Sequence, residues 1–295
     1  MGVTRPLQQA AMSRVVTPSL VAAVSNTGAL GMMAVGRSPA EQVLQQFEAI
    51  RAQTNRPFGA GFIVRFLDRD VLDALAERVS ILEFFYDWPD PSLVLPGTIT
   101  GWQVGSVEEA KAAVDAGCCF VVAQGVEAGG HVRGTTSFNS LVSGVRAAVD
   151  VPVVAAGGIG TAADVRVAFA LGADAVRVGT RFLGAAEVDI HPTYRQSLFD
   201  ATADDAHYTT VFEVGWPDAP QRALASSIAA ATADGPEPVG YLGNTPLPRR
   251  GTTPPNSNTT GQIEAMALYA GRSVANVRRV EPAASIINEL LEGVS

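Results

Sequence analysis

Two short apolar segments that each end at glycine have the residues best suited to bind a phosphate. They occupy residues 153–159 and 175–180. Because glycine has no Cβ, the backbone N–H groups at such a turn can approach an anion closely. In a barrel of eight parallel strands, the loops after strands seven and eight commonly bind a cofactor phosphate. The sequence therefore predicts a phosphate site built from Gly158, Gly179 and Thr180.

Residues 158–163 also match the glycine pattern of a dinucleotide-binding turn, Gly-x-Gly-x-x-Ala. That fold places an acidic residue about twenty positions later, at the end of the next strand, to hold the ribose hydroxyls. Here Arg177 and Gly179 occupy that place, and Asp174 comes before the strand. A second contact to the same phosphate explains the pattern better than a Rossmann fold does.

A glycine-rich loop with a histidine follows another apolar segment, at residues 123–134. Gln124 offers a donor and an acceptor, as the pyrimidine edge of a flavin requires, and Gly129 and Gly130 let the backbone approach a flat ring. His131 is one of three histidines. An imidazole that titrates near neutrality can take a proton from carbon or donate one. Beside a phosphate site, a catalytic role is favoured over the alternative of a solvated histidine in a glycine-rich turn.

The elements that must position these loops alternate regularly along the chain. Short apolar segments alternate with amphipathic helical segments, which is typical of a parallel sheet. Eight segments have the length and content of strands, near residues 7–10, 29–34, 58–63, 81–85, 98–104, 119–123, 153–156 and 175–178. Eight is the number that a closed (β/α)8 TIM barrel requires. Ser38 and Ser106 each precede a helical pattern and have Glu three residues later, as in a capping box.

The alternation of strands and helices ends after the eighth expected strand. Residues 182–235 look mainly helical, and residues 244–261 are rich in Pro, Gly, Asn and Thr, which is typical of a loop. The connection after the fourth strand, residues 86–97, also has no helical pattern. The expected organisation is a barrel, a loop or lid, and C-terminal helices that pack on the barrel, at residues 1–235, 236–261 and 262–295. Those helices could instead pair two subunits in a homodimer.

Composition excludes several classes of function. The chain has 295 residues and a formal net charge of −8 without a basic cluster, which argues against a nucleic-acid partner. No apolar run approaches the roughly 20 residues that span a bilayer, and the N-terminal residues do not resemble a signal peptide. We therefore expect no membrane partner and a cytoplasmic location. Cys118 and Cys119 are the only cysteines and are adjacent, which excludes a disulfide framework.

Taken together, these segments resemble the nitronate monooxygenase family, also known as 2-nitropropane dioxygenases, which are FMN-dependent TIM barrels. The resemblance extends from Pro6 to about Phe212. The matching segments are residues 6–12, 23–31, 124–131, 151–159 and 178–183. The chain departs from the family pattern at Gly61, where the family usually has an Asn that touches FMN, and at Ala11, where Pro is common.

The resemblance implies a role for individual residues. Contacts to the flavin ring are implied for Met12, Gln124 and Gly129. Contacts to the phosphate are implied for Gly158, Arg177, Val178, Gly179 and Thr180. His131 matches the family's catalytic base, which removes the α-proton of a nitroalkane or assists the nitronate before flavin and O₂ oxidise it. The implied cofactor is FMN, and no metal is implied.

Three other functions stay open at this point. The first is an enoyl reductase or dehydrogenase that uses NAD(P)H and flavin on an acyl thioester, with Arg133 or the Arg249–Arg250 pair holding the carrier's phosphates. The second is a flavin-free isomerase or synthase whose glycine turns bind a sugar phosphate. The third is an FMN-binding module without catalysis. The favoured reading is an oxidoreductase whose partners are a small-molecule substrate and O₂.

Overall fold

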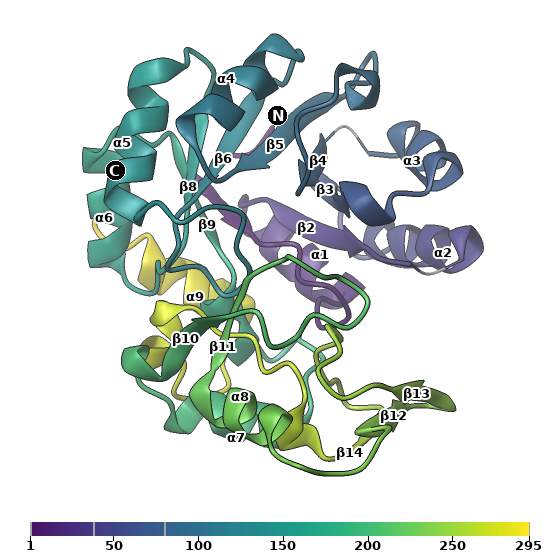
Figure 1. Ribbon diagram of the computed structural model, residues 1–295. Coiled ribbons are helices and arrows are strands. Elements are labelled where there is room, and N and C mark those ends of the chain that lie inside the picture. The colour runs from purple at the N-terminus through teal and green to yellow at the C-terminus, as the bar shows by residue number, and fades with distance from the viewer. Residues whose placement is uncertain (1, 38, 80, 295) are drawn as a thin grey trace.

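Eight parallel strands form a barrel, as the sequence predicts. The computed structural model describes residues 2–37, 39–79 and 81–294. The strands are β1 (Leu7–Gln9), β2 (Gly31–Val35), β3 (Phe58–Ile63), β4 (Ile81–Phe85), β5 (Ile99–Val104), β6 (Phe120–Gln124), β8 (Val153–Ala156) and β9 (Ala175–Val178). They pair in the order β1-β9-β8-β6-β5-β4-β3-β2 (Figure 1). The barrel closes where β1 pairs with Leu30, whose N–H donates to the carbonyl of Leu7 at 2.9 Å.

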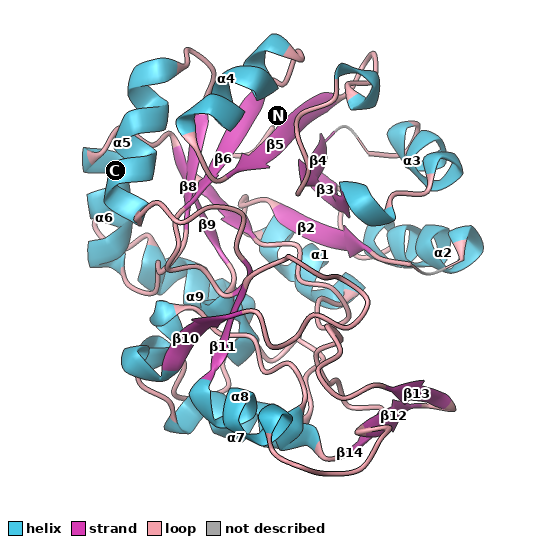
Figure 2. Ribbon diagram, viewed as in Figure 1, coloured by secondary structure: helices cyan, strands magenta, loops and turns pink. Residues whose placement is uncertain are grey.

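Helices cover the outside of the barrel and connect most consecutive strands (Figure 2). They are α1 (Pro18–Asn26), α2 (Ala40–Arg51), α3 (Arg69–Ala76), α4 (Val107–Asp115), α5 (Phe138–Ala148), α6 (Ala162–Ala170) and α9 (Ala283–Leu290). Between β4 and β5 the described residues hold only a short 3-10 turn, Pro91–Leu93, in agreement with the loop expected there. The last helix, α9, packs against α1 and α6 and so covers its own barrel.

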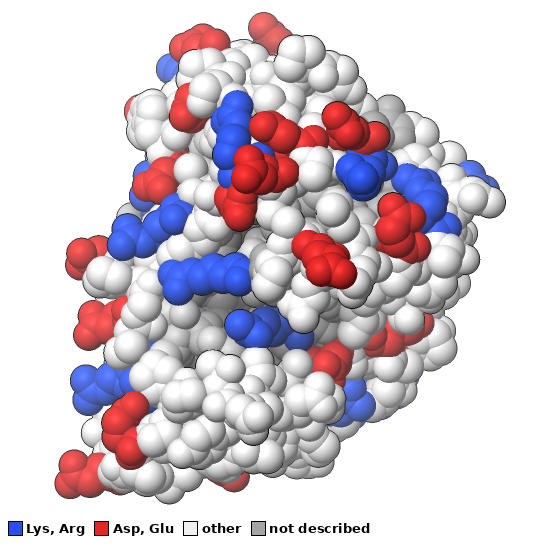
Figure 3. Space-filling model, turned by 90° about the vertical axis from the view of Figure 1, so that its right-hand side faces the viewer, with Lys and Arg blue, Asp and Glu red and all other residues white. Residues whose placement is uncertain are grey.

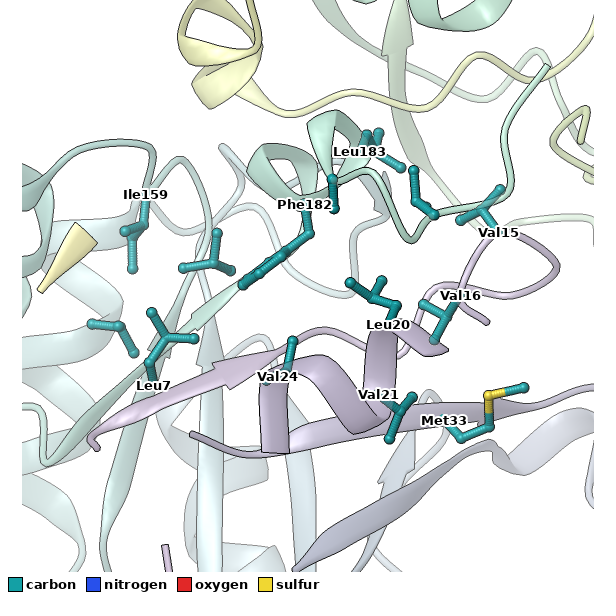
Figure 4. Close-up of a cluster of buried hydrophobic side chains, with 14 of the residues drawn as sticks. Leu7, Val15, Val16, Leu20, Val21, Val24, Met33, Ile159, Phe182 and Leu183 are labelled. Atoms are coloured by element: carbon teal, nitrogen blue, oxygen red, sulfur yellow. The ribbon is translucent and has the colours of Figure 1, made fainter. Parts of the chain in front are cut away.

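The main hydrophobic core lies between the barrel and its helices. Leu20 and Val24 are four residues apart, so they share one face of α1, and both are buried. Figure 4 shows them beside Leu7 of β1 and Phe182 of the 3-10 helix η3 (Thr180–Gly184). Burying one such side chain contributes about 1.5–3 kcal/mol. This packing fixes the segment after β9, where Thr180 lies, against the first βα unit.

Inside the barrel, an apolar layer near the strand starts is followed by a polar layer. The apolar layer includes Met32, Ile81, Phe120 and Val122. The polar layer consists of the buried side chains of Gln8, Glu83, Gln103 and Arg177. Side chains alternate along a strand, so Arg177 points into the barrel while Val176 and Val178 join the core beneath the helices.

The segment between β9 and α9 holds two small sheets, which corrects two expectations. Its elements are α7 (Pro192–Asp200), β10 (Ala206–Thr209), β11 (Gln221–Leu224), α8 (Ala225–Thr232), β12 (Gly240–Leu242), β13 (Thr245–Leu247) and β14 (Thr259–Gly261). The mainly helical segment expected over residues 182–235 thus contains a strand pair, and the loop expected over 244–261 contains two strands that pair with β12. These strands have three or four residues each, too few to show an alternating pattern in the sequence.

One predicted helix start differs in detail from the structure. Ser106 accepts a hydrogen bond from the N–H of Glu109 at 3.1 Å, but Glu109 does not complete a capping box. Its carboxylate instead accepts from the N–H of Gly105 at 2.7 Å and pairs with Arg133 at 2.7 Å. The cap expected at Ser38 lies outside the described residues. Over the described ranges, no helix is both long and apolar enough to cross a membrane.

Candidate active site

A cavity of about 350 Å³ opens at the carboxyl ends of the barrel strands. This is the end at which barrel enzymes place their reactive groups. Eight of the nine predicted site residues line the cavity: Met12, Gln124, Gly129, His131, Gly158, Arg177, Gly179 and Thr180. The ninth, Val178, is buried in the core instead. The structure therefore brings together residues at or just after the ends of β1, β6, β8 and β9, which are far apart in the sequence.

The glycine turn after β8 has the geometry of an anion cradle. Gly157 and Gly158 both adopt positive φ, at 113° and 74°, a region that favours glycine. The N–H groups of Gly158 and Gly179 make no hydrogen bond within the described part of the chain. The hydroxyl of Thr180 accepts from the N–H of Gly271 at 3.0 Å and keeps its own hydrogen available as a donor. These groups fit a phosphate that approaches from the cavity.

The two departures from the family pattern lie next to each other. A Cβ placed on Gly61 would lie 2.7 Å from the Cβ of Ala11, so the pair leaves no room for a larger side chain at Gly61 without a shift. Both residues line the cavity. Gly129 is constrained in another way, because a Cβ there would lie 2.4 Å from the N atom of Gly271. That glycine is required by the packing of two chain segments as well as by any ring above it.

The backbone of His131 is fixed by contacts with two other segments of the chain. It lies in the two-residue strand β7 (Gly130–His131), where it pairs with Gln221 of β11. Gln124 donates from Nε2 to the carbonyl of His131 at 3.0 Å and accepts from the N–H of Arg133 at 3.3 Å. One donor and one acceptor of the Gln124 amide are thus engaged with the loop that carries His131, which leaves a second N–H and a second oxygen lone pair for the flavin edge that the sequence suggested.

Aromatic side chains surround the His131 imidazole. Trp216 stacks on it with ring centres 3.9 Å apart and an interplanar angle of 22°. Tyr269 and Tyr86 lie at 5.6 and 6.4 Å. The Nε2 atom is buried and has no hydrogen-bond partner among the described residues. Burial in these surroundings lowers the pKa of His131 to about 3, so the ring is neutral at pH 7 and does not titrate near neutrality as the sequence suggested.

The low pKa of His131 predicts acid sensitivity. Below its ordinary value of 6.5 the imidazole binds a proton in the unfolded chain, whereas the folded protein excludes that proton until about pH 3. The unfolded state then binds more protons, so stability falls as the pH drops from about 6.5 towards 3, by up to about 1.4 kcal/mol per unit. Urea unfolding at pH 7 and pH 5 should show a loss about 1–2 kcal/mol smaller in His131→Asn than in the parent. Equal losses in the two proteins would contradict the burial of a neutral imidazole.

The Arg177 side chain is paired with other polar side chains inside the barrel. It forms an ion pair with Glu83, donates from Nε to Gln8 at 3.2 Å and also contacts Gln103. Burial lowers the pKa of Arg177 to about 9, which leaves the guanidinium charged at neutral pH. The sequence comparison with the family placed Arg177 at the phosphate. In the structure Arg177 lines the cavity and its guanidinium is paired with Glu83, Gln8 and Gln103, so a phosphate contact of Arg177 stays a prediction.

Sequence reasoning missed three residues that shape the site: Glu83, Tyr86 and Trp216. Glu83 is the only acidic residue in the apolar run of β4, and that isolation was a usable sign of a buried ion pair. Trp216 lies in the segment expected to be helical, and its contact with His131 depends on the pairing of β7 with β11. No local pattern in the sequence predicts the pairing of β7 with β11.

Comparison with known sequences identifies similar proteins over nearly the whole chain. The profile of the family described as nitronate monooxygenase matches residues 1–87 and 67–293. A nitronate monooxygenase from Paraburkholderia phytofirmans is 28% identical, over 98% of this chain and 92% of its own length. A nitronate monooxygenase from Pseudomonas aeruginosa is 31% identical, over 67% of this chain and 71% of its own length.

Solved structures resemble the fold equally well. FabK from Thermotoga maritima superposes with a TM-score of 0.81 at 27% identity, covering 98% of this chain and 92% of its own. A nitroalkane oxidase from Streptomyces ansochromogenes superposes with a TM-score of 0.82 at 27% identity, covering 99% of this chain and 96% of its own. Both likenesses include the barrel and the segment between β9 and α9.

Proposed function

Because the chain belongs to the nitronate monooxygenase family and is an oxidoreductase, we propose that it binds FMN and oxidises nitronates with O₂, with His131 as the base of the site. One observation carries the proposal. A cradle of unpartnered backbone N–H groups at Gly158 and Gly179 opens into the same cavity as the unpartnered Nε2 of His131. A phosphate held in that cradle would leave the rest of the cofactor in reach of the imidazole.

The residues divide the work of the reaction among them. When bound, FMN would take electrons from the substrate and deliver them to O₂. Gly158, Gly179 and Thr180 would hold its phosphate, and Met12 and Gly129 would border its ring. Trp216, Tyr86 and Tyr269 exclude water from the imidazole. Gln124 fixes the backbone on which His131 stands, so the base keeps one position.

The protonation of His131 favours a nitronate over a neutral nitroalkane as the substrate. At pH 7 the imidazole is unprotonated and its Nε2 can accept a proton. A pKa of about 3 makes it a weak base, however, and catalytic bases work best when their pKa lies near the working pH. A nitronate has already lost its α-proton, so its oxidation does not depend on that step. We therefore expect faster turnover of a nitronate than of the parent nitroalkane.

The decisive experiment is a spectrum followed by two titrations. The purified protein should be yellow, with flavin absorbance, and should release FMN on denaturation. Addition of propyl-1-nitronate should consume O₂ without a nicotinamide. Under anaerobic conditions, NADPH should leave the flavin oxidised. Colourless protein that contains no flavin would refute the proposal and favour a phosphate-binding isomerase. Bleaching by NADPH without nitronate oxidation would favour an NAD(P)H-dependent enoyl reductase acting on an acyl thioester.

The phosphate cradle can be tested by one substitution. Gly158→Asp would add a negative charge at the cradle and a Cβ 3.2 Å from the Cβ of Glu127. We expect FMN to bind about tenfold to a hundredfold more weakly, as measured by fluorescence titration of the apoprotein. Gly158→Asn has the same shape without the charge. Gly97 also has a positive φ, 80°, with nothing within 4 Å of a Cβ, and it does not line the cavity. Gly97→Asp is therefore the control for backbone strain, and equal weakening in Gly97→Asp and Gly158→Asp would contradict the cradle.

A further inference from the structure

A buried carboxylate that the proposed reaction does not use lies close to the loop that carries His131. Glu109 is in the first turn of α4, and its side chain is 9% exposed. Opposite charges lie side by side at several places on the surface, as the face in Figure 3 shows, and such exposed pairs usually contribute little. A buried carboxylate is different, because it needs a partner to offset its desolvation. For Glu109 that partner is Arg133, at 2.7 Å, two residues after His131.

Glu109 connects the loop of His131 to the turn after β5. Its Oε2 accepts a hydrogen bond from the N–H of Gly105 at 2.7 Å, and its Oε1 pairs with Nη2 of Arg133. The two backbones also meet here, since a Cβ on Gly134 would lie 2.2 Å from the carbonyl oxygen of Gly105. The ion pair thus spans a close contact between the turn after β5 and the chain that follows His131.

Arg133 also contacts an aromatic ring beside the imidazole. Its guanidinium carbon lies 5.2 Å from the centre of the Tyr86 ring, within the range of a cation–π contact. Tyr86 in turn meets His131 edge to face at 6.4 Å. The φ of Tyr86 is 66°, which is uncommon for a bulky residue and persists only where the surroundings hold it. The ion pair and the imidazole therefore share Tyr86 as a neighbour.

The backbone between His131 and Arg133 is fixed at each residue. The Gln124 amide bonds the carbonyl of His131 and the N–H of Arg133. Val132 lies between them with its side chain buried, and its N–H donates to the carbonyl of Pro220 at 2.9 Å. Because residues 131–133 have so little freedom, a shift at Arg133 moves His131 as well.

We propose that Glu109 and Arg133 are positioning residues, whose ion pair fixes the loop of His131 so that the imidazole meets the α-carbon of the substrate in one orientation. This inference rests on the proposed function for the reaction that the imidazole serves. Neither Glu109 nor Arg133 lines the cavity, so their effect passes through His131 and not through contact with the substrate. A displacement of about 1 Å at a reacting group can lower a rate about a hundredfold.

The test compares a substrate that needs the base with one that does not. The measured quantity is the ratio of kcat for 1-nitropropane to kcat for its preformed nitronate. Arg133→Met keeps the apolar stem without the charge, and Glu109→Gln removes the charge of the other partner. Each should lower the ratio about tenfold, with KM and FMN content unchanged.

Two further variants show that the pair is the cause. The double variant Glu109→Gln/Arg133→Met should have a ratio no lower than the lower of the single variants, because all three proteins lose the same interaction. Arg133→Lys keeps a positive charge that can reach Glu109, so it should retain more of the ratio than Arg133→Met does. A double variant that shows the full product of the single losses would contradict a shared role.

Arg146 provides a matched control near the starts of β8 and β9. Its side chain is 29% exposed, against 28% for Arg133, and it pairs with Asp174 at 3.1 Å. Asp174 also accepts from a backbone N–H, that of Val153, at 2.8 Å. Arg146→Met should therefore disturb the fold in a similar way but leave the ratio unchanged, since Arg146 does not line the cavity. An unchanged ratio in Arg133→Met, or an equal fall in Arg146→Met, overturns the proposal.

Chemical modification of His131 separates this inference from the proposed reaction. Diethyl pyrocarbonate acylates unprotonated imidazoles that it can reach, and peptide mass mapping distinguishes His131 from the exposed His207. The rate at His131 relative to His207 should rise about threefold or more in Arg133→Met, because the loop opens more often, and stay the same in Arg146→Met. If neither substrate is oxidised but this pattern holds, the positioning role stands and the proposed reaction fails. If both are oxidised but neither the kcat ratio nor the modification rate changes, the reaction stands and the positioning role fails.

Discussion

Replacing His131 by Ala should reduce the turnover of nitroalkanes about a hundredfold or more and the turnover of nitronates by less than about tenfold. Only the nitroalkane needs a base to remove its α-proton. His131 lines the cavity and its Nε2 has no hydrogen-bond partner among the described residues, so this atom can accept the proton. The measurement is O₂ consumption with 1-nitropropane and with its preformed nitronate, in the same buffer and with the FMN content of each protein determined.

Two further results make that test specific. FMN content should be the same in the parent and in His131→Ala, because the cradle at Gly158 and Gly179 does not involve the imidazole. His131→Gln keeps a polar side chain of similar reach but is not a base at pH 7, so it should behave as His131→Ala does. An equal loss on both substrates would assign His131 to positioning, and an undiminished nitroalkane rate would remove it from proton transfer.

Replacing Arg177 by Leu should lower the free energy of unfolding by about 3–5 kcal/mol. The substitution leaves Glu83 as an unpaired charge inside the barrel, where its side chain is 3% exposed. Desolvation of that charge is no longer offset by its partner. Urea denaturation followed by circular dichroism measures the change, with FMN content recorded because Arg177 also lines the cavity.

A double-mutant cycle shows whether the pair is the cause. Glu83→Leu/Arg177→Leu removes both charges, so the double variant should be more stable than Arg177→Leu alone, even though two side chains have changed. Gln103 loses its Arg177 partner in both proteins, whereas Gln8 keeps Glu83 as an acceptor in Arg177→Leu and loses it only in the double variant, which makes the expected gain smaller. A double variant less stable than the parent by the full sum of the losses in Arg177→Leu and Glu83→Leu would mean that the two residues act independently.

The barrel was predictable because its strands are buried on both faces. Such strands read as continuous apolar runs, and both β8 and β9 end at glycine; after β8 the turn itself requires it, because Gly157 and Gly158 have positive φ. Those two properties are local in sequence, so they fix the phosphate cradle as well as the strands. The position of His131 after β6 was predictable for the same reason, because active-site loops of barrels follow the strand ends.

The environment of His131 was not predictable, because it depends on contacts between distant segments. Trp216 reaches the imidazole through a short strand pair, and Gln124 turns to the loop backbone because the carbonyl of His131 and the N–H of Arg133 are in reach there. The inward direction of Arg177 follows from strand alternation, but its partner Glu83 comes from a strand nearly a hundred residues earlier. Spacing along the chain gives no measure of such distances.

The late position of α9 has a consequence for how this protein is made. Residues 179–282 separate β9 from α9, the helix that packs against α1 and α6. During synthesis the N-terminal segments emerge first, so the apolar groove between α1 and α6 stays open to water while the whole intervening segment is translated. Nascent chains that end before α9 would be the form most prone to aggregate and most dependent on chaperones. The segments that line the active site would all have been synthesised before α9 packs against α1 and α6.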